Sequence, residues 1–544
     1  MKLFTIFLSA TMAAMGLQGA AEDTHDAVFS DFSYHVTAPD TTAGAGSPMI
    51  AGCYPDPSIV RVEDDYFLVN SSFAFFPGVP IWHSTDLKNW ERLGYVLNRR
   101  EQLDLPDGLR ISGGIYAPDL SYNPRNGLFY MITTLVDNGG NFYVTCTDPL
   151  IGDWSDPVWL PEVGGIDPSI LFDTDGRGYI VNNDAPEGEP LYEGHRAIHI
   201  HDFDWRHGKV EGKSKVIVDG GVNISDKPVW IEGPHLYHIG DKYFLMCAEG
   251  GTGPDHREVI FSSDSPKGPF EPCAINPILT QRDLSPARPD PVTCAGHADL
   301  VEDKDGNWWS VFLGVRPYNA AGHDIMGRET YIHPVKWTDG QPVITEPGEI
   351  LSPKSQQERQ SALWTADGLV KEAFFIRNPQ PDFYTVDSAG TLRLKALLTG
   401  ITDRKSPAAI GLWATENAFE ITTTLKEFLP VSPDHIAGLV LFQDDNCNIL
   451  LGKSLDTDGT PCVKLVARSK GAITHIASHR LRSHLSQLRL KIVADGKGEY
   501  RFFAAENAEE YAPVGTPVPA SNLSTSTAGN FTGTMVGVYA SAKK

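Results

Sequence analysis

Short apolar runs, each followed by a turn and then by a run rich in aromatic residues, recur along the first two thirds of the chain. Five segments share this plan, and each turn carries Gly or Asp, residues that favour tight turns between strands. The segments cover residues 56–69, 117–132, 167–181, 233–246 and 296–312. Each predicts a β-hairpin, and helical periodicity is almost absent. Five such units at a period of about 50 to 65 residues predict a five-bladed β-propeller over residues 48–345.

The pattern changes after the fifth repeat. A stretch rich in Pro, Gly and Glu predicts a linker over residues 346–361. Beyond it, apolar and polar residues alternate, most clearly at Phe419, Ile421, Thr423 and Leu425 and at Leu488, Leu490 and Ile492. Alternation of this kind is typical of half-buried antiparallel strands. Residues 362–544 therefore predict a β-sandwich domain, and the whole chain is expected to be all-β.

Residues 1–21 predict a cleaved signal peptide. Lys2 supplies a short positive segment, an apolar run starts at Leu3, and Gly19-Ala20-Ala21 offers small residues for cleavage. A membrane anchor is the alternative, but the run is short and interrupted by Thr and Ser. No other stretch is suited to span a bilayer, so we expect a secreted or periplasmic protein.

Composition excludes several classes of function. The chain is 41% hydrophobic and 21% charged, as globular proteins are. Its net charge of −24 would repel phosphate backbones, so no nucleic-acid partner is expected. The seven cysteines contain no CxxC pair, which argues against a zinc site. Seven is odd and sparse for a disulfide scaffold, and one or two bridges are left open. The sequence gives no indication of the oligomeric state.

Equivalent positions of the repeats carry ionisable side chains. Asp56 and Asp167 each begin an Asp-Pro-Ser triplet, Glu232 lies one residue before the equivalent position, and His297 occupies it in the fifth repeat. In a propeller, such positions surround one mouth of the central channel. Carboxylates that converge there raise one another's pKa, so one is protonated beside an ionised neighbour. Glycoside hydrolysis uses such a pair, an acid for the leaving oxygen and a base for water.

Each of these signals also has a simpler structural explanation. A single Asp-Pro-Ser triplet is more often a turn than an active site. Several aromatic residues could stack on sugar rings, although each is more often a core residue: Trp82, Tyr116, Trp154, Trp159 and Trp230. Arg328 could grip a carboxylate or a sugar hydroxyl, or form a surface salt bridge. His297 could be a polar group of the channel, a hydrogen-bond donor or a cation ligand. The matched register of three carboxylates favours the functional interpretation.

Three motifs resemble the signatures of glycoside hydrolase family 43. They are Tyr54-Pro55-Asp56-Pro57-Ser58, Gly165-Ile166-Asp167-Pro168-Ser169 and Glu232-Gly233-Pro234-His235. Supporting matches, such as Gly114-Ile115-Tyr116-Ala117-Pro118 and Gly327-Arg328-Glu329-Thr330, extend the resemblance over nearly all of residues 50–345. The resemblance implies a propeller with an inverting mechanism. In it Asp56 is the general base, Glu232 the general acid, and Asp167 tunes and orients the acid.

The resemblance also implies residues that bind substrate. Phe73 and Tyr116 would line the sugar subsite, and Arg328 would hold a hydroxyl. His297 would lie in the channel, where some relatives hold a calcium ion or water. No cofactor is required and no metal ligand is assigned; a structural calcium near His297 is compatible with the resemblance.

The C-terminal half resembles, more loosely, the concanavalin A-like β-sandwich of the family's β-xylosidases. In those proteins the sandwich closes over the mouth of the propeller and helps to make the pocket exo-acting. Phe531, in Gly529-Asn530-Phe531-Thr532-Gly533, matches the residue that reaches into the pocket.

The implied function is release of a terminal pentose from hemicellulose oligosaccharides, such as fragments of xylan or arabinoxylan. The pentose would be β-D-xylose, α-L-arabinofuranose or both, and the loop around Asp184 resembles a branch with α-L-arabinofuranosidases. Alternatives are an α-L-arabinofuranosidase only, or a sugar-binding propeller without catalysis. A fructan or sucrose hydrolase would carry an Asn-Asp motif near the first strand, which is absent.

Overall fold

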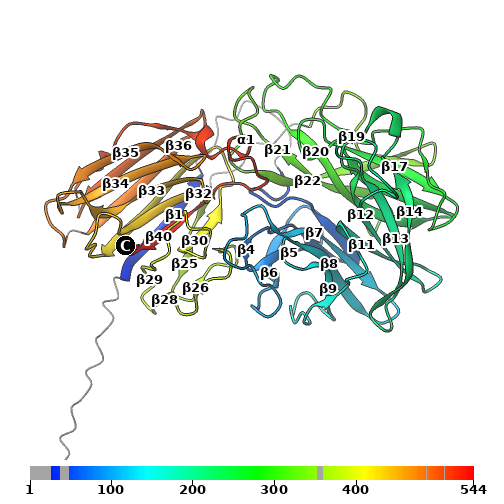
Figure 1. Cartoon of the computed structure of the whole chain (residues 1–544), viewed down its shortest axis with the longest axis horizontal. Coiled ribbons are helices and arrows are strands. Elements are labelled where there is room, and N and C mark those ends of the chain that lie inside the picture. The colour runs from blue at the N-terminus through cyan, green and yellow to red at the C-terminus, as the bar shows by residue number, and fades with distance from the viewer. Residues whose placement is uncertain (1–25, 37–47, 352–358, 486, 508, 544) are drawn as a thin grey trace, which may run out of the picture.

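The computed structural model describes residues 26–36, 48–351, 359–485, 487–507 and 509–543. Within these ranges β-strands dominate, and they form two domains that lie side by side (Figure 1). No helix in this part of the chain is long and apolar enough to cross a membrane. The signal peptide predicted at residues 1–21 lies outside the described residues and stays a prediction.

Five antiparallel sheets, one for each predicted repeat, form the first domain. Blade 1 contains β2 (Ser58–Val62), β3 (Asp65–Val69), β5 (Gly78–Ser84) and β6 (Glu91–Leu97). Blade 2 contains β7 (Gly114–Asn123), β8 (Leu128–Val136), β9 (Gly140–Cys146) and β10 (Val158–Trp159). Blade 3 contains β11 (Ile166–Phe172), β12 (Gly178–Asp184), β13 (Ala197–Asp204) and β14 (Lys209–Asp219).

Blades 4 and 5 complete the set. Blade 4 contains β15 (Glu232–Ile239), β16 (Lys242–Glu249), β17 (Arg257–Ser263), β18 (Glu271–Pro272) and β19 (Leu279–Thr280). Blade 5 contains β20 (Thr293–Glu302), β21 (Trp308–Val315), β22 (Arg328–Thr338) and β23 (Gln341–Val343). A short 3-10 helix, η1 (Ile224–Asp226), lies between blades 3 and 4.

The inner strands of the five blades close into a ring. β2 contacts β7, and the contacts continue through β11, β15 and β20 back to β2. The start of the domain also joins the last blade, because Ile50 pairs with Thr330 and the Tyr54 N–H donates to the Arg328 carbonyl. The predicted hairpins, the all-β class and the five-bladed propeller are therefore confirmed.

Each inner strand bends at the same place. The residue there has a positive φ in all five repeats, at Asp56, Ala117, Asp167, Gly233 and His297. In four of the strands, β7, β11, β15 and β20, the pairing register shifts beside it. Bulges of this kind bend a strand and redirect its side chains. Non-glycine residues adopt such backbone at a cost of about 1 to 3 kcal/mol, and such strain clusters at functional sites.

Two further sheets form the second domain. The first contains β28 (Tyr384–Val386), β29 (Leu392–Lys395), β1 (Asp26–Val36), β31 (Ala418–Glu427), β36 (Leu488–Asp495), β37 (Glu499–Glu506), β38 (Ala512–Pro513), β24 (Arg359–Ser361) and β39 (Val518–Pro519). The second contains β30 (Ala408–Trp413), β40 (Met535–Ser541), β32 (Ile436–Asp444), β33 (Cys447–Leu455), β34 (Pro461–Ser469) and β35 (Ala472–Arg480). Smaller elements are β25 (Trp364–Thr365), β26 (Gly368–Leu369), η2 (Ala520–Leu523) and α1 (Thr525–Ala528).

The predicted alternation is confirmed in this sandwich. Phe419, Ile421 and Leu425 of β31 are buried, and β36 alternates buried and half-buried residues along its whole length. Buried side chains of both sheets, among them Ile421 and Leu490 of the first and Leu439 and Val538 of the second, pack in one hydrophobic cluster. Apolar side chains on the inner faces of two sheets therefore hold the domain together.

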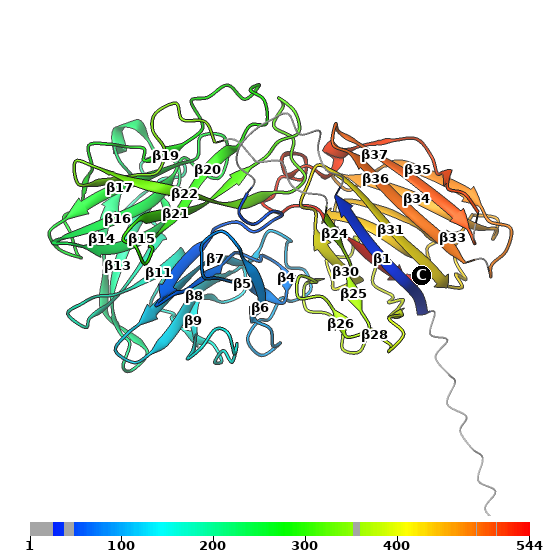
Figure 2. The same ribbon diagram turned by 180° about the vertical axis from the view of Figure 1, so that it is seen from behind.

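Two segments lie where the sequence pattern did not place them. β1 comes before the propeller in sequence, yet it is a strand of the sandwich and lies beside β31 (Figure 2). It pairs with β31 on one edge and with β29 on the other. β24 pairs with β1, so residues 359–361 are part of a sheet and not of the predicted linker. Strand pairing across more than 300 residues leaves no local pattern, which is why the sequence did not predict it.

The two domains are joined by direct pairing and by buried charge. β4 (Phe75–Phe76) of the propeller pairs with β27 (Phe375–Ile376) of the sandwich. Arg316, after β21, binds Glu329 in its own blade and Glu416 in the sandwich. The Thr534 N–H donates to the Ile325 carbonyl. These contacts fix the sandwich against the mouth of the propeller.

All seven cysteines lie within the described residues, and each is a free thiol. Neither of the two bridges left open by the sequence is formed. Six of the seven are buried, so they act as small apolar residues of the core.

Candidate active site

A cavity of about 430 Å³ opens at one mouth of the propeller channel. It is lined by Asp56, Phe73, Arg110, Tyr116, Ile166, Asp167, Trp230, Glu232, Gly251, Thr252, His297, Arg328 and Phe531. All eight site residues inferred from the sequence line this one cavity. The bends of the inner strands bring Asp56, Tyr116, Asp167, Glu232 and His297 together, because each bend lies at the same end of its blade. Phe73, Arg328 and Phe531 reach the cavity from other segments.

Asp56 is held as an anion. Its Oδ1 accepts a hydrogen bond from Arg328 Nη1 at 3.2 Å and lies 3.5 Å from His297 Nδ1. Its Oδ2 accepts from the Ser71 hydroxyl at 2.6 Å. Burial acts to raise the pKa of Asp56, but the Arg328 charge, His297 and the Ser71 hydrogen bond outweigh it. The pKa of Asp56 is therefore below its usual value, and the carboxylate is ionised at neutral pH.

The other two carboxyl groups are shifted in the opposite direction. Burial, together with the charge of Asp56, raises the pKa of Asp167 to about 7. Burial and then the charges of Asp167 and Asp56 raise the pKa of Glu232 well above its usual value. Asp167 Oδ2 also accepts the Gly233 N–H at 3.1 Å, which ties blade 3 to the residue after Glu232. At neutral pH the cavity thus combines the ionised Asp56 with the protonated Glu232, and Asp167 titrates between them.

Aromatic rings and one guanidinium shape the rest of the cavity. Tyr116 packs edge-on against Phe73 and against Phe531, with ring centres 5.7 and 6.4 Å apart. Arg328 lies over the rings of Phe73 and Phe531 at 5.7 and 5.5 Å. Its Nε is buried and has no hydrogen-bond partner among the described residues. Arg328 therefore binds Asp56 through Nη1, while its buried Nε has no partner in the described part of the chain.

Comparison with known proteins agrees with this geometry. A model described as glycosyl hydrolases family 43 matches residues 45–342, and one described as the beta xylosidase C-terminal concanavalin A-like domain matches residues 366–544. A xylosidase/arabinosidase of Butyrivibrio fibrisolvens is 35% identical over 92% of this chain and 96% of its own length. The chain belongs to glycosyl hydrolase family 43.

Further family 43 proteins share both domains. A non-reducing end α-L-arabinofuranosidase of Bacteroides ovatus is 37% identical over 91% of either chain. The crystal structure of a GH43_12 protein from a capybara gut metagenome has a TM-score of 0.84 and 38% identity. That match covers 94% of this chain and 99% of the other. The order of propeller and sandwich is therefore shared along the whole length.

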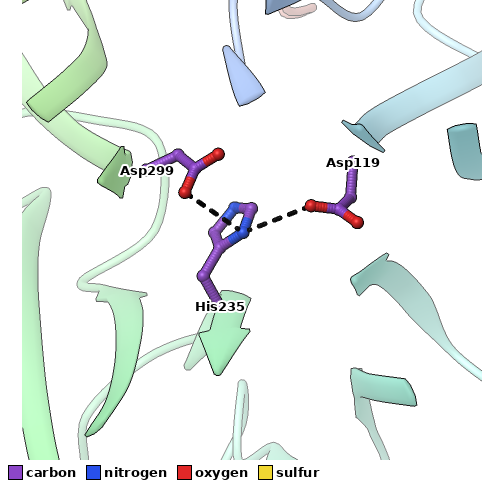
Figure 3. Close-up of side chains that lie close together, drawn as sticks. All are labelled: Asp119, His235 and Asp299. Atoms are coloured by element: carbon purple, nitrogen blue, oxygen red, sulfur yellow. Dashed lines mark ion pairs between the residues drawn. The ribbon is translucent and has the colours of Figure 1, made fainter. Parts of the chain in front are cut away.

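His297 of this family 43 enzyme lies beside Asp56 in the channel. Burial lowers the pKa of His297 to about 4, against the attraction of Asp56, so the imidazole is neutral. Calcium takes six to eight oxygen ligands. Among the described residues, one cluster of side chains has its possible metal-binding atoms close together: Asp119, His235 and Asp299 (Figure 3). His297 is not part of this cluster.

That cluster does not fit a metal ion, because its carboxylates are already used. Asp299 accepts hydrogen bonds from Ile59 N, Ser58 Oγ, Leu300 N and Tyr237 Oη. Asp119 accepts from Ile170 N and Ser121 Oγ, and its Oδ1 lies 3.2 Å from the Ser58 hydroxyl that donates to Asp299. The calcium expected near His297 stays a prediction.

Some residues of the cavity were not found as site residues from the sequence. Trp230 has a positive φ and lines the cavity, and the Arg196 guanidinium stacks on its ring at 4.3 Å. Arg110 bonds to Asp137 at the rim. Trp82 and Trp154 are buried in the fold, and Trp159 lies on the surface against Phe142. Aromatic type alone did not separate Trp230 from these, since only the tertiary fold places it at the mouth.

Proposed function

We propose that this family 43 hydrolase releases single terminal pentoses from hemicellulose oligosaccharides with inversion of configuration. The observation that carries the proposal is the opposite ionisation of Asp56 and Glu232 in one aromatic cavity. An ionised carboxylate and a protonated acid are what glycoside hydrolysis requires, and inversion is what the resemblance to family 43 implies. The named relatives, a xylosidase/arabinosidase and an α-L-arabinofuranosidase, support a pentose as the released sugar.

Each carboxyl group has a distinct role in the proposed reaction. Asp56 removes a proton from water as that water attacks the anomeric carbon. Glu232 gives its proton to the oxygen of the leaving alcohol. The Asp167 charge keeps the pKa of Glu232 high, and the Arg328 charge keeps Asp56 ionised.

The sandwich supports attack at chain ends. Phe531 comes from the sandwich, yet its ring lines the cavity beside Tyr116. The Asn530 side chain, bonded to Gln443, and Thr532 hold the loop in place. Because Phe531 closes this side of the cavity, the cavity can hold one terminal sugar but not a polysaccharide chain that continues past it.

Hydrolysis of the nitrophenyl glycosides of β-D-xylose and α-L-arabinofuranose tests the proposal. Wild type is expected to cleave one or both, and Glu232→Gln to lose most of the rate on the natural oligosaccharides, where the leaving group needs its proton. The ratio of the two rates identifies the preferred pentose. Proton NMR of the first product distinguishes inversion from retention. A sugar-binding propeller without catalysis would bind pentosides and cleave neither.

Export completes the proposal. The apolar run from Leu3 and the small residues at positions 19–21 support a signal peptide. Sequencing the N-terminus of the exported protein is expected to begin at Glu22, and retention of Met1 would contradict export by cleavage.

A further inference from the structure

A second layer of polar side chains lies directly behind the catalytic carboxyl groups. It consists of the residues two positions after each bend: Ser58, Asp119, Ser169, His235 and Asp299. All five are buried. A narrow space of about 10 Å³ in the channel is lined both by Asp56, Asp167 and His297 and by Asp119, Ser169 and His235 of the second layer. The two layers are therefore adjacent.

Asp299 of blade 5 bonds to both neighbouring blades. Its Oδ2 accepts the Ile59 N–H at 2.8 Å and the Ser58 hydroxyl at 2.9 Å, both in blade 1. Its Oδ1 accepts the Tyr237 hydroxyl of blade 4 at 2.7 Å. One carboxylate thus joins three blades.

Asp119 of blade 2 also contacts both neighbouring blades, blade 1 and blade 3. Its Oδ2 accepts the Ile170 N–H of blade 3 at 3.0 Å, and its Oδ1 lies 3.2 Å from the Ser58 hydroxyl of blade 1. Ser169 of blade 3 donates to the Pro234 carbonyl of blade 4 at 2.5 Å. The Leu120 N–H of blade 2 donates to the Ser58 hydroxyl oxygen of blade 1 at 3.0 Å. With the Asp299 bonds, every pair of adjacent blades is connected, and the hydrogen bonds form a closed belt.

The belt is attached to the catalytic residues through the backbone. Ser58 follows Asp56 by two residues, and Pro234 follows Glu232 by two. His235 lies inside the belt, with Nδ1 3.5 Å from Asp119 and 3.6 Å from Asp299 (Figure 3). Because propeller blades contact each other mainly through apolar side chains, directional bonds are what can fix the distance across the channel.

We propose that Asp119 and Asp299 are positioning residues of the hydrolysis, which hold the general base and the general acid at the separation that the reaction needs. The proposal rests on the function proposed above for Asp56 and Glu232. Neither aspartate touches the cavity that binds substrate. Substitution of Asp119 or Asp299 should therefore change the rate of the chemical step and not the affinity for substrate.

The test compares Asp119→Asn and Asp299→Asn with a control aspartate. Asp173 is also buried and also joins blades 3 and 4, through the Tyr243 hydroxyl and His238, but it lies outside the belt. Each belt variant is expected to lower kcat about 10- to 100-fold with KM nearly unchanged, since small misplacements of reacting groups have effects of this size. Asp173→Asn is expected to lower the melting temperature without this loss of kcat.

Two further variants keep the result interpretable. Ser58→Ala removes one hydroxyl from the belt and is expected to fold and to show a smaller loss of kcat. Asp299→Glu keeps the charge and the acceptor oxygens and is expected to recover part of the rate. The proposal is overturned if the belt variants lose no more kcat than Asp173→Asn at an equal loss of melting temperature.

Failure of the proposed function would give a different result. Wild type would then cleave no pentoside, and the role of the belt would be read from crystal structures instead. In Asp299→Asn the carboxyl groups of Asp56 and Glu232 are expected to shift relative to each other by more than about 0.5 Å, the tolerance of productive geometry. Superposition within that tolerance would overturn the positioning role.

Discussion

Opposite ionisation of neighbouring carboxyl groups is the main finding at the scale of single residues. The Arg328 guanidinium and the Ser71 hydroxyl donate hydrogen bonds to Asp56 and stabilise its ionised form. Glu232 gains burial and two nearby acids, which stabilise its neutral form. The same side-chain chemistry therefore yields a base and an acid, and the environment decides which is which.

The pH dependence of kcat/KM follows from these directions. Activity needs Asp56 ionised, and the pKa of Asp56 is lowered. As the pH falls, kcat/KM is therefore expected to decrease only at a pH below the usual pKa of an aspartate. Activity also needs Glu232 protonated, so it falls as pH rises through the raised pKa of that residue. Replacing Asp167 by Asn removes a charge that raises the pKa of Glu232. The alkaline limb is then expected to move to lower pH, and an unchanged limb would contradict the role given to Asp167.

Bends at the starts of the inner strands are the decisive feature at the scale of elements. At Gly233 the bend has a φ of 54°, and an added Cβ would lie 2.7 Å from His297 Nε2. No such contact exists at Gly240, in the turn of the same hairpin, where φ is 66° and the space is open. Backbone strain is thus similar at the two glycines, but only one has no room for a side chain.

Replacing each of these two glycines by alanine separates the effect of backbone strain from the effect of a steric clash with His297. Gly233→Ala is expected to displace His297 or Glu232 and to lower kcat by at least about tenfold. Gly240→Ala is expected to reduce stability slightly and to leave kcat near wild type. Kinetics and thermal melts of both variants check this. Equal loss of kcat in the two would show that strain alone, and not the contact with His297, limits the site.

Docking of the sandwich on the propeller is what completes the site at the scale of the whole molecule. Arg316 Nε and Nη2 bind both oxygens of Glu329, which is fully buried, and Nη1 binds Glu416 across the interface. Glu329 also accepts the Gly52 N–H and lies next to Arg328 in sequence. The interface and the arginine that holds Asp56 therefore share one stretch of backbone.

Arg316→Ala leaves Glu329 buried without its partner. A buried charge that loses its partner typically costs about 3 to 5 kcal/mol, so a large fall in melting temperature is expected. Arg480→Ala removes an ion pair with Asp458 that is exposed to solvent, and a much smaller fall is expected there. Thermal unfolding of both variants makes the comparison, and equal falls would contradict the role given to the buried pair.

Phe531 tests the contribution of the sandwich to binding. Phe531→Ala removes the ring that Tyr116 and Arg328 contact. KM is expected to rise about tenfold, which corresponds to about 1.4 kcal/mol of binding, with a smaller change in kcat. Phe503→Ala, in β37 of the same domain, is the control and is expected to leave KM unchanged. An unchanged KM in Phe531→Ala would exclude the sandwich from substrate binding.

Much of this site could be predicted because the fold repeats. The hairpins, the matched positions of Asp56 and Asp167 and the offset position of Glu232 are all local patterns, and a ring of repeats brings equivalent positions to one mouth. Phe73, Tyr116, Arg328 and Phe531 were inferred from motifs, and the cavity contains them all. Trp230 was not distinguished from other tryptophans, because its place at the mouth depends on the fold of neighbouring loops, such as the one that carries Arg196.

Residue types and their period thus determined the blades, the sandwich strands and the three carboxyl groups. Only the tertiary structure decided that residues 26–36 complete the sandwich, that Arg316 bridges the domains, and that Asp119 and Asp299 close a belt behind the catalytic groups. The physical reason is the distance along the chain over which each kind of interaction acts. Alternation and turn residues act between neighbours in the chain, whereas strand partners, burial and shifted pKa values depend on groups that folding brings together from hundreds of residues apart.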